Sequence, residues 1–337
     1  MIEKYYSGVI EQIYNRIGKE TRNIVMANYS NDFSIENLEV IRRYQSNEDN
    51  VFFAYSEFSY NTLVGAYEPF LDIICNMHRR FIGGSFDDFQ KECGVYYLHR
   101  QVLNSYYETG ECFREETVLL NEVAYEQRRM TMAIADMLKR LSEVRPLMIV
   151  INRFQMASKS SIETIKYLID NPCANIGIAL GVNAIVKGAD STVEVWDRIV
   201  ESLEDRSAIY YIGSAGPLKN NIKTTNDDEL YITMNFEQSI QEASNIMEFL
   251  DYEQARRGCR IIEHKIKFEN AWIDEKSLRR FYLVYARTSV LLGEMSKAIE
   301  LMNEYKALIP ENDSEHYFSL YYFMKGTCYM YQGKLEK

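Results

Sequence analysis

The clearest candidate for chemistry in this sequence is a pair of polar residues at the end of an apolar run. The run PLMIVI, residues 146–151, stops abruptly at Asn152 and Arg153. Short runs of this kind are typical of strands buried inside a parallel sheet, and ligands of such sheets bind at the carboxyl ends of the strands. A guanidinium at that edge is well placed to meet an anion. Asn152 and Arg153 therefore predict a site for an anionic ligand such as a nucleotide.

A second apolar run predicts the rest of this site. Residues 22–27, RNIVMA, fit a buried parallel strand, and Asn28, Ser30 and Ser34 follow it. We expect Ser34 to be the N-cap of the helix that comes next. Because parallel strands end at one edge of their sheet, these three polar residues are expected to contact the same ligand as Arg153.

The elements that must position these residues alternate between strands and helices. Helices are expected in the intervening segments, including a long helical stretch up to residue 145 to which we assign no role. Further strands are expected at residues 50–58, 175–182, 208–213 and 229–234. Strands separated by helices predict a parallel sheet covered on both faces, which is a three-layer α/β domain. Beyond residue 236 the apolar spacing is helical only, so an all-α segment should follow.

The most specific stretch of the chain is residues 281–310. Aromatic and small residues, a glycine turn and a terminal proline occupy the places expected of a tetratricopeptide repeat. These residues are Tyr282, Ala286, Gly293, Ala298 and Pro310. Residues 321–337 begin the same pattern again and stop within it. Because a solenoid repeat normally ends in a polar cap, we expect the repeats to be truncated at residue 337 and to continue in a longer protein.

Composition limits the classes of function. Of 337 residues, 47% are hydrophobic and 26% are charged, which is typical of a globular protein with room for two domains. A net charge of -11 argues against a nucleic-acid surface. No window approaches the roughly eighteen apolar residues of a membrane span, so we expect a cytoplasmic protein that does not bind membranes. The cysteines and histidines lack metal-ligand spacing, and no metal is expected.

Three longer segments resemble a known family. Residues 153–168 (RFQMASKSSIETIKYL) are similar to the region after the second Walker motif of the STAND class of signal-transduction ATPases, which carry an AAA-like P-loop domain before helical repeats. Residues 54–74, with their Pro-Phe-Leu helix start at Pro69, resemble the second-strand segment of those proteins. Residues 229–250 resemble their fifth strand and the helices after it. The resemblance covers residues 20–337.

The sequence departs from this family where phosphate should bind. A P-loop needs a glycine-rich turn and a lysine, yet residues 22–61 contain no glycine and no lysine. Asn152 stands where the family places an acid that holds magnesium. Losing these groups together removes most of the electrostatic stabilisation on which phosphoryl transfer depends, so we expect hydrolysis to be lost.

The resemblance implies a division into an N-terminal helix (1–20), a degenerate P-loop NTPase-like α/β domain (21–236), a helical linker (237–275) and tetratricopeptide-like repeats (276–337). It implies a non-catalytic regulatory module of a bacterial signalling protein. Its repeats would bind a protein or peptide partner. The longer chain would carry an output domain, such as a diguanylate cyclase or a DNA-binding helix-turn-helix, and residues 1–337 are not expected to be an enzyme.

Two alternatives stay open. In the first, the chain is a switch that binds ATP or ADP without turnover at Asn28, Ser30, Ser34, Asn152 and Arg153. In the second, it is an unorthodox ATPase in which acids after the second strand hold a metal. Those acids are Glu57, Glu68 and Asp72.

Overall fold

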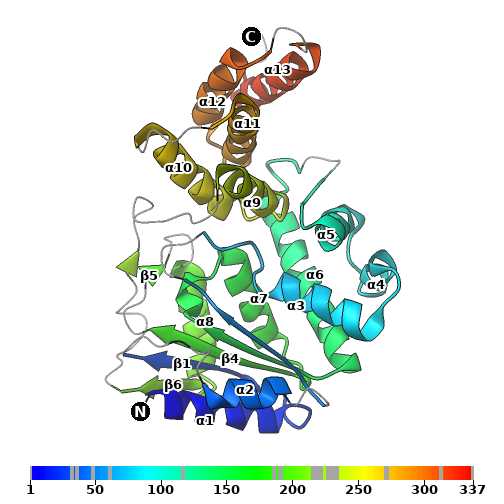
Figure 1. Ribbon diagram of the computed structural model, residues 1–337, viewed down its shortest axis with the longest axis vertical. Coiled ribbons are helices and arrows are strands. Elements are labelled where there is room, and N and C mark those ends of the chain that lie inside the picture. The colour runs from blue at the N-terminus through cyan, green and yellow to red at the C-terminus, as the bar shows by residue number, and fades with distance from the viewer. Residues whose placement is uncertain are drawn as a thin grey trace. The chain divides into compact units, whose positions relative to one another are not determined.

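The structure is a computed structural model of the whole chain (Figure 1). It describes residues 2–30, 34, 38–46, 50–59, 63–114, 118–183, 187–188, 193–213, 223–224, 235–268, 273–310 and 314–334. The chain forms two compact units. Unit 1 consists of residues 1–100 and 129–225, and unit 2 of residues 101–128 and 226–337.

Unit 1 contains a five-stranded sheet in which every neighbouring pair is parallel. From one edge to the other the strands are β2 (Phe52–Glu57), β3 (Leu147–Asn152), β4 (Ile176–Asn183), β1 (Ile24–Tyr29) and β6 (Ile209–Ile212). The residues of β3 and β4 are all buried, as expected of strands covered on both faces. Two short strands, β5 (Lys187–Gly188) and β7 (Lys223–Thr224), pair separately.

Helices cover both faces of this sheet, which confirms the predicted α/β class (Figure 1). On one face lie α1 (Ile2–Arg16) and α2 (Glu39–Ser46), and on the other lie α7 (Lys159–Asp170) and α8 (Val193–Glu204). Between β2 and β3 the chain forms α3 (Phe70–Met77), the π-helical turn η1 (His78–Ile82), α4 (Phe86–Glu92), α5 (Tyr97–Thr109) and α6 (Val123–Val144). The 3-10 turn η2 (Phe154–Met156) follows β3 directly.

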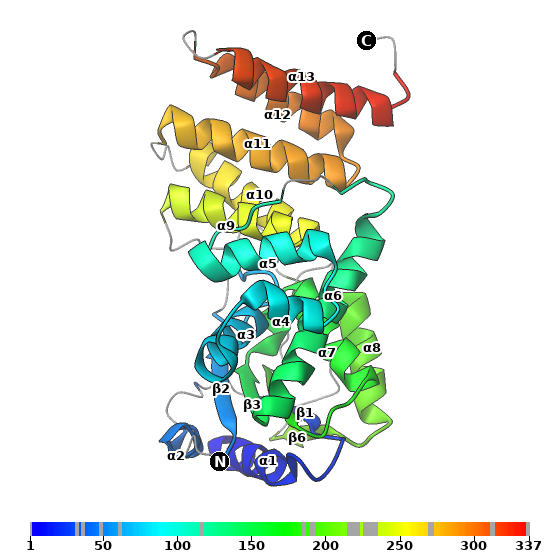
Figure 2. The same ribbon diagram turned by 90° about the vertical axis from the view of Figure 1, so that its right-hand side faces the viewer.

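The described residues of unit 2 form helices and loops and contain no strand. Its helices after residue 226 are α9 (Phe236–Glu248), α10 (Tyr252–Phe268), α11 (Glu275–Leu291), α12 (Met295–Ala307) and α13 (Ser314–Tyr331), which stack one after another (Figure 2). Gly293 and Gly333 each come two residues after a helix ends, and both have positive φ, 78° and 70°. Glycine suits that left-handed turn because it has no side chain. Ala286 and Ala298 are fully buried where α11 and α12 pack together.

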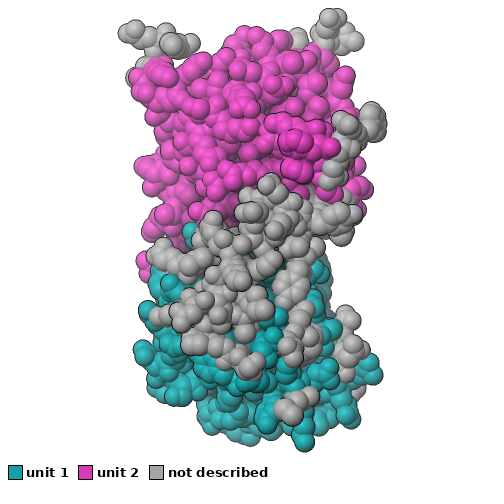
Figure 3. Space-filling model, turned by 90° about the vertical axis from the view of Figure 1, so that its left-hand side faces the viewer, with its two compact units in different colours: residues 1–100, 129–225 teal, residues 101–128, 226–337 magenta. Residues whose placement is uncertain are grey.

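Residues 101–128, to which the sequence assigned no role, are part of unit 2 (Figure 3). Asn245 of α9 holds them with both ends of its amide. Its Nδ2 donates to the carbonyl of Gly110 at 3.0 Å, and its Oδ1 accepts from the N–H of Cys112 at 2.9 Å. Gln127 adds a hydrogen bond to the carbonyl of Leu250 at 2.6 Å. A segment inserted between two strands of the sheet is therefore built into the helical unit.

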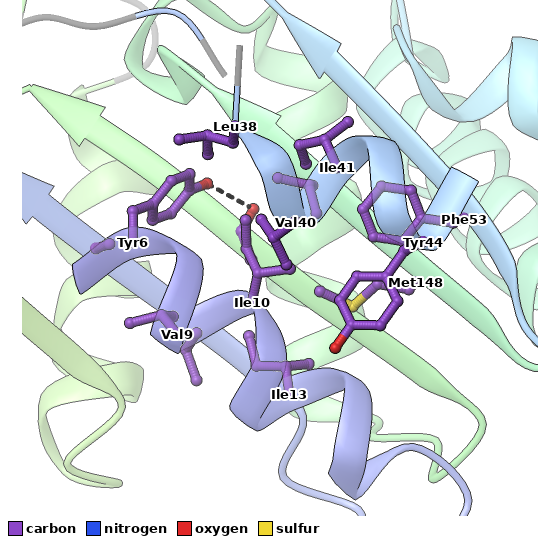
Figure 4. Packing of buried hydrophobic residues seen from close by; sticks show 14 of the residues in the cluster. Tyr6, Val9, Ile10, Ile13, Leu38, Val40, Ile41, Tyr44, Phe53 and Met148 are labelled. Carbon is purple, nitrogen blue, oxygen red and sulfur yellow. Dashed lines mark hydrogen bonds between the residues drawn. The ribbon is translucent and has the colours of Figure 1, made fainter. Parts of the chain in front are cut away.

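The core of unit 1 beneath α1 and α2 shows why these helices form. Buried α1 residues recur at helical spacing, from Tyr6 through Ile10 to Ile13, and make one apolar stripe. They pack with α2 side chains such as Ile41 and with Phe53 of β2 (Figure 4). The helix also approaches β4 closely, because a Cβ at Gly177 would lie 2.8 Å from side-chain atoms of Ile13 and Ile17. Only a glycine fits there without movement.

Two predicted boundaries were wrong. The first strand runs from Ile24 to Tyr29 and not over residues 22–27, because β4 and β6 continue to pair with it through Asn28 and Tyr29. Ser34 is not the N-cap of the next helix, since α2 begins at Glu39.

The strand predicted at 229–234 lies outside the described residues. No helix in the described part of the chain is both long enough and apolar enough to cross a membrane.

Candidate functional site at the carboxyl edge of the sheet

The sheet topology marks one place where a ligand would bind. The chain leaves β1 through α2, on one face, and leaves β4 through α8, on the other face (Figure 1). Because β1 and β4 are neighbours, their connections diverge at their carboxyl ends, which is where ligands bind in open α/β sheets. Tyr29 and Asn183 are paired at this point. The candidate site is therefore the edge formed by the last residues of β1 to β4.

Tyrosines fill this edge from the side of α1. The hydroxyl of Tyr29 donates to Oδ1 of Asn152. The hydroxyl of Tyr6 donates to the carbonyls of Ile151 and Ala179 at 3.4 and 3.3 Å, and Figure 4 draws a hydrogen bond of this hydroxyl as a dashed line. Tyr6, Tyr29 and Asn152 are all fully buried. Burial, with a smaller contribution from the charge of Glu57, raises the pKa of Tyr6 far above its ordinary value. Its hydroxyl therefore stays protonated and acts as a donor.

A glycine makes this arrangement possible. A Cβ at Gly181 of β4 would lie 2.6 Å from Oδ1 of Asn152 and 3.1 Å from the hydroxyl of Tyr6. The first distance is too short for a methyl group unless Asn152 moves, and the second would require the hydroxyl to move by a few tenths of an ångström. The strands, the amide and the tyrosines are therefore packed without spare volume at this point.

An ion pair occupies the ends of β2 and β3. Nη1 of Arg153 lies 3.1 Å from Oε1 of Glu57, and it donates to the carbonyl of Phe58 at 3.3 Å. The hydroxyl of Ser34 donates to the other carboxylate oxygen of Glu57 at 3.0 Å. Both charged side chains are largely buried, with 19% of Arg153 and 14% of Glu57 exposed. Arg153 adopts a left-handed backbone conformation, φ 53°, between β3 and η2.

The five predicted site residues thus lie in four separate places. Arg153 and Ser34 meet at Glu57, whereas Asn152 belongs to the tyrosine cluster. Asn28 is fully buried within β1. Ser30 lies against the end of β6, where a Cβ at Gly213 would come within 2.8 Å of its Oγ. The sequence predicts one shared ligand site, whereas the residues that follow β1 and β3 lie in separate clusters.

The other acids considered as metal ligands do not gather with Glu57. The side chain of Glu68 accepts from the N–H of Gly65 at 3.0 Å, and burial raises its pKa. Asp72 is exposed in the first turn of α3. Within the described ranges, no three or more His, Cys, Asp or Glu residues are grouped so that they could hold a metal ion.

Sequence reasoning missed the two tyrosines and the role of Glu57. Tyr29 adjoins Asn28 and would have been placed in the site if the strand had been extended by two residues. The contact between Tyr6 and Ala179 spans 173 positions, and nothing local in the sequence signals it. The pairing of Glu57 with Arg153 follows from the adjacency of β2 and β3, which is a property of the fold.

No protein-family model matches the chain, and no curated protein is similar to it. The function is therefore inferred from the fold and from the contacts of the side chains described above.

Proposed function

We propose that this chain is a non-catalytic regulatory module of a larger bacterial signal-transduction protein. In this proposal unit 1 is a degenerate P-loop NTPase-like domain and unit 2 is a tetratricopeptide-like repeat segment that binds a protein or peptide partner. A parallel sheet in which β1 lies beside β4, and a helical unit with repeated glycine turns, support this reading.

One observation carries the proposal: the polar groups at the carboxyl ends of β2 and β3 bind neighbouring side chains. Asn152, where a metal-binding acid would be needed, is a neutral amide engaged by Tyr29. The carboxylate of Glu57 is engaged on both oxygens, by Arg153 and by Ser34. Phosphoryl transfer depends on donors and metal ions aimed at the phosphates. Here the same positions hold the sheet edge together, as expected of a scaffold that keeps the fold without the chemistry.

A nucleotide titration tests this proposal. Thermal unfolding and calorimetry are measured with ATP, ADP and GTP, each with and without magnesium. A ligand at about 100 times its Kd would stabilise the native state by about 2.7 kcal/mol, a large shift in Tm. We expect no shift at millimolar nucleotide and no release of phosphate. Phosphate release that depends on magnesium would refute the loss of catalysis.

A nucleotide-binding switch is the second candidate, and the position of Arg153 favours it. Its guanidinium stands at the carboxyl end of a central strand, where anions bind in open α/β sheets. An incoming phosphate would have to displace Glu57, so Glu57→Gln should strengthen nucleotide binding if the switch exists. Stabilisation of the wild type by nucleotide, lost in Arg153→Ala, would favour the switch over the scaffold.

A further inference from the structure

Unit 2 contains an open groove in the surface formed by α10, α11 and α12. The C-terminal half of α10, Tyr285 of α11 and residues 293–297 at the start of α12 line this groove. Its volume is about 930 Å³, near the upper end of the range for small-molecule sites. The groove is therefore large enough for several side chains of a partner.

The groove is basic, although the chain as a whole is acidic. Five of the 17 residues of α10 are arginine or lysine and two are glutamate, whereas the net charge of the chain is -11. Arg260 and Lys267 lie seven positions apart on one face of α10, and both are exposed. Lys297 of α12 lines the same groove and also pairs, at 2.9 Å, with the exposed residue Glu300 outside it.

The two carboxylates in the lining do not cancel this charge. Oε1 of Glu263 lies 2.7 Å from Nζ of Lys267 and 3.2 Å from Nζ of Lys297, so that one negative charge is shared by two cations. Oε1 of Glu294 lies 2.6 Å from Nη1 of Arg256, which does not line the groove. Both acids are thus paired with cations, and the groove keeps a surplus of positive charge.

An exposed aromatic ring lies beside these cations. Phe268, the last residue of α10, is 72% exposed and lines the groove. Its ring lies 4.7 Å from that of His264. Exposed apolar side chains next to polar ones are typical of surfaces that bind a protein or peptide, where aromatic residues serve as anchors. The groove therefore offers an apolar contact as well as positive charge.

We propose that this groove binds an acidic peptide segment. Carboxylates of the peptide would face Arg260, Lys267 and Lys297, and an apolar side chain would pack on Phe268. A peptide is favoured over a nucleic acid because it can place neutral residues opposite the two carboxylates of the lining, whereas a phosphate backbone is charged at every step. The inference rests on the proposed function, in which unit 2 binds a protein or peptide partner, and it adds the charge of that partner.

The test measures the binding of two labelled octapeptides to the full chain by fluorescence anisotropy. One peptide consists of glutamates around a single phenylalanine, and the other has glutamine in place of every glutamate. The acidic peptide should bind at least about tenfold more tightly at about 0.1 M salt. This preference should largely disappear at about 1 M salt, because the Debye length falls from about 10 Å to about 3 Å.

Ser296 offers a matched pair of variants that should fold. It is exposed in the first turn of α12 and lines the groove. Ser296→Glu adds a negative charge to the groove, and a negative charge at this end of a helix favours the helix. Ser296→Gln adds a side chain of the same size without the charge. The acidic peptide should bind about threefold or more weakly to Ser296→Glu than to Ser296→Gln.

Reversing the charge of the groove itself should have a larger effect. Arg260→Glu combined with Lys267→Glu should weaken binding of the acidic peptide by about tenfold or more. Lys276→Glu is the control, because Lys276 is exposed in α11 and does not line the groove. That variant should change the affinity by less than about twofold, since its charge is screened from the groove.

Three results would overturn the proposal. One is equal affinity for the two peptides. Another is binding of the acidic peptide that neither Ser296→Glu nor the double reversal weakens. In both of these cases a peptide still binds, so the proposed function stands and only the groove or the charge of the partner is wrong. The third is tighter binding of an oligothymidylate than of the acidic peptide, which would assign the groove to a nucleic acid and remove support from the proposed function as well.

Discussion

Replacing Gly181 by alanine should disrupt the buried cluster at the end of β4. The new Cβ would lie 2.6 Å from Oδ1 of Asn152, 3.1 Å from the hydroxyl of Tyr6 and 3.3 Å from Cε1 of Tyr29. The closest of these atoms accepts the hydrogen bond of Tyr29. Relieving the clash therefore requires Asn152 to turn away, and that bond is then lost inside the core.

The expected cost follows from three contributions. Overpacking of a core costs about 1–3 kcal/mol, and losing a buried hydrogen bond costs about 0.5–1.5 kcal/mol. Against these, replacing a strand glycine by alanine recovers about 0.5–1 kcal/mol of backbone entropy. We therefore expect Gly181→Ala to lower the free energy of unfolding by about 0.5–4 kcal/mol, with a central value of about 2 kcal/mol.

Chemical unfolding can report on unit 1 alone. Trp196 in α8 is 1% exposed, and its ring lies 5.5 Å from that of Phe154, so its fluorescence should change when unit 1 unfolds. The other tryptophan, Trp272, is replaced by phenylalanine in every variant to remove its signal. Gly8→Ala is the matched control, because a Cβ built on Gly8 meets nothing within 4 Å and the residue is exposed in α1. That variant should be as stable as the parent or more stable.

A double-mutant cycle with Asn152→Ala tests the cause. Shortening Asn152 removes the closest clashing atom, so Gly181→Ala should cost about 1–2 kcal/mol less in that background than in the parent. Costs that add within about 0.5 kcal/mol would show that the two residues do not interact as described. A Gly181→Ala variant as stable as the parent would refute the close packing itself.

Three further predictions concern other contacts. Arg153→Ala should destabilise unit 1 by about 1–3 kcal/mol in chemical unfolding, because the largely buried carboxylate of Glu57 then has no cation beside it. Adding Glu57→Gln to that variant should recover part of the lost stability, because it removes the unpaired charge. Burial raises the pKa of the Cys75 thiol to about 11 and that of Cys93 to about 12, from an ordinary value of 9.0. Above about pH 9 the thiols of the unfolded chain lose protons that the native state keeps, so the free energy of unfolding should fall as pH rises toward 11–12. The fall should be less steep in Cys75→Ala. Equal falls between about pH 8 and about pH 10 in the parent and in Cys75→Ala would contradict this. Asn245→Ala should speed proteolytic cleavage near residue 111, since it removes both side-chain hydrogen bonds that hold that segment to α9. An unchanged rate of cleavage would mean that other contacts suffice.

Much of the fold was predictable because local patterns reflect local structure. The apolar run before Asn152 predicted β3 to within a residue at each end, and the run before Gly213 likewise predicted β6. Gly293 was correctly placed at a turn between two helices. The end of β1 was misplaced because a buried asparagine, Asn28, resembles a loop residue when hydrophobicity is the only guide.

The candidate site was less predictable because its contacts join distant residues. Sequence placed Asn152 and Arg153 correctly at the end of a strand. It could not show that Arg153 turns toward Glu57, since this requires β2 and β3 to be neighbours in the sheet. That nucleotide does not bind at this edge stays a prediction, which the titration above tests.

The sequence by itself determined the alternation of strands and helices, the change to an all-helical segment and the glycine turns, because periodicity and turn chemistry act within a few residues. Tertiary structure alone decided that Tyr6 occupies the edge of the sheet and that residues 101–128 join the helical unit. It also decided that Arg114 is buried against Glu248, whose carbonyl accepts its hydrogen bond. Such features depend on which surfaces pack together across more than a hundred positions, and no local pattern encodes that choice.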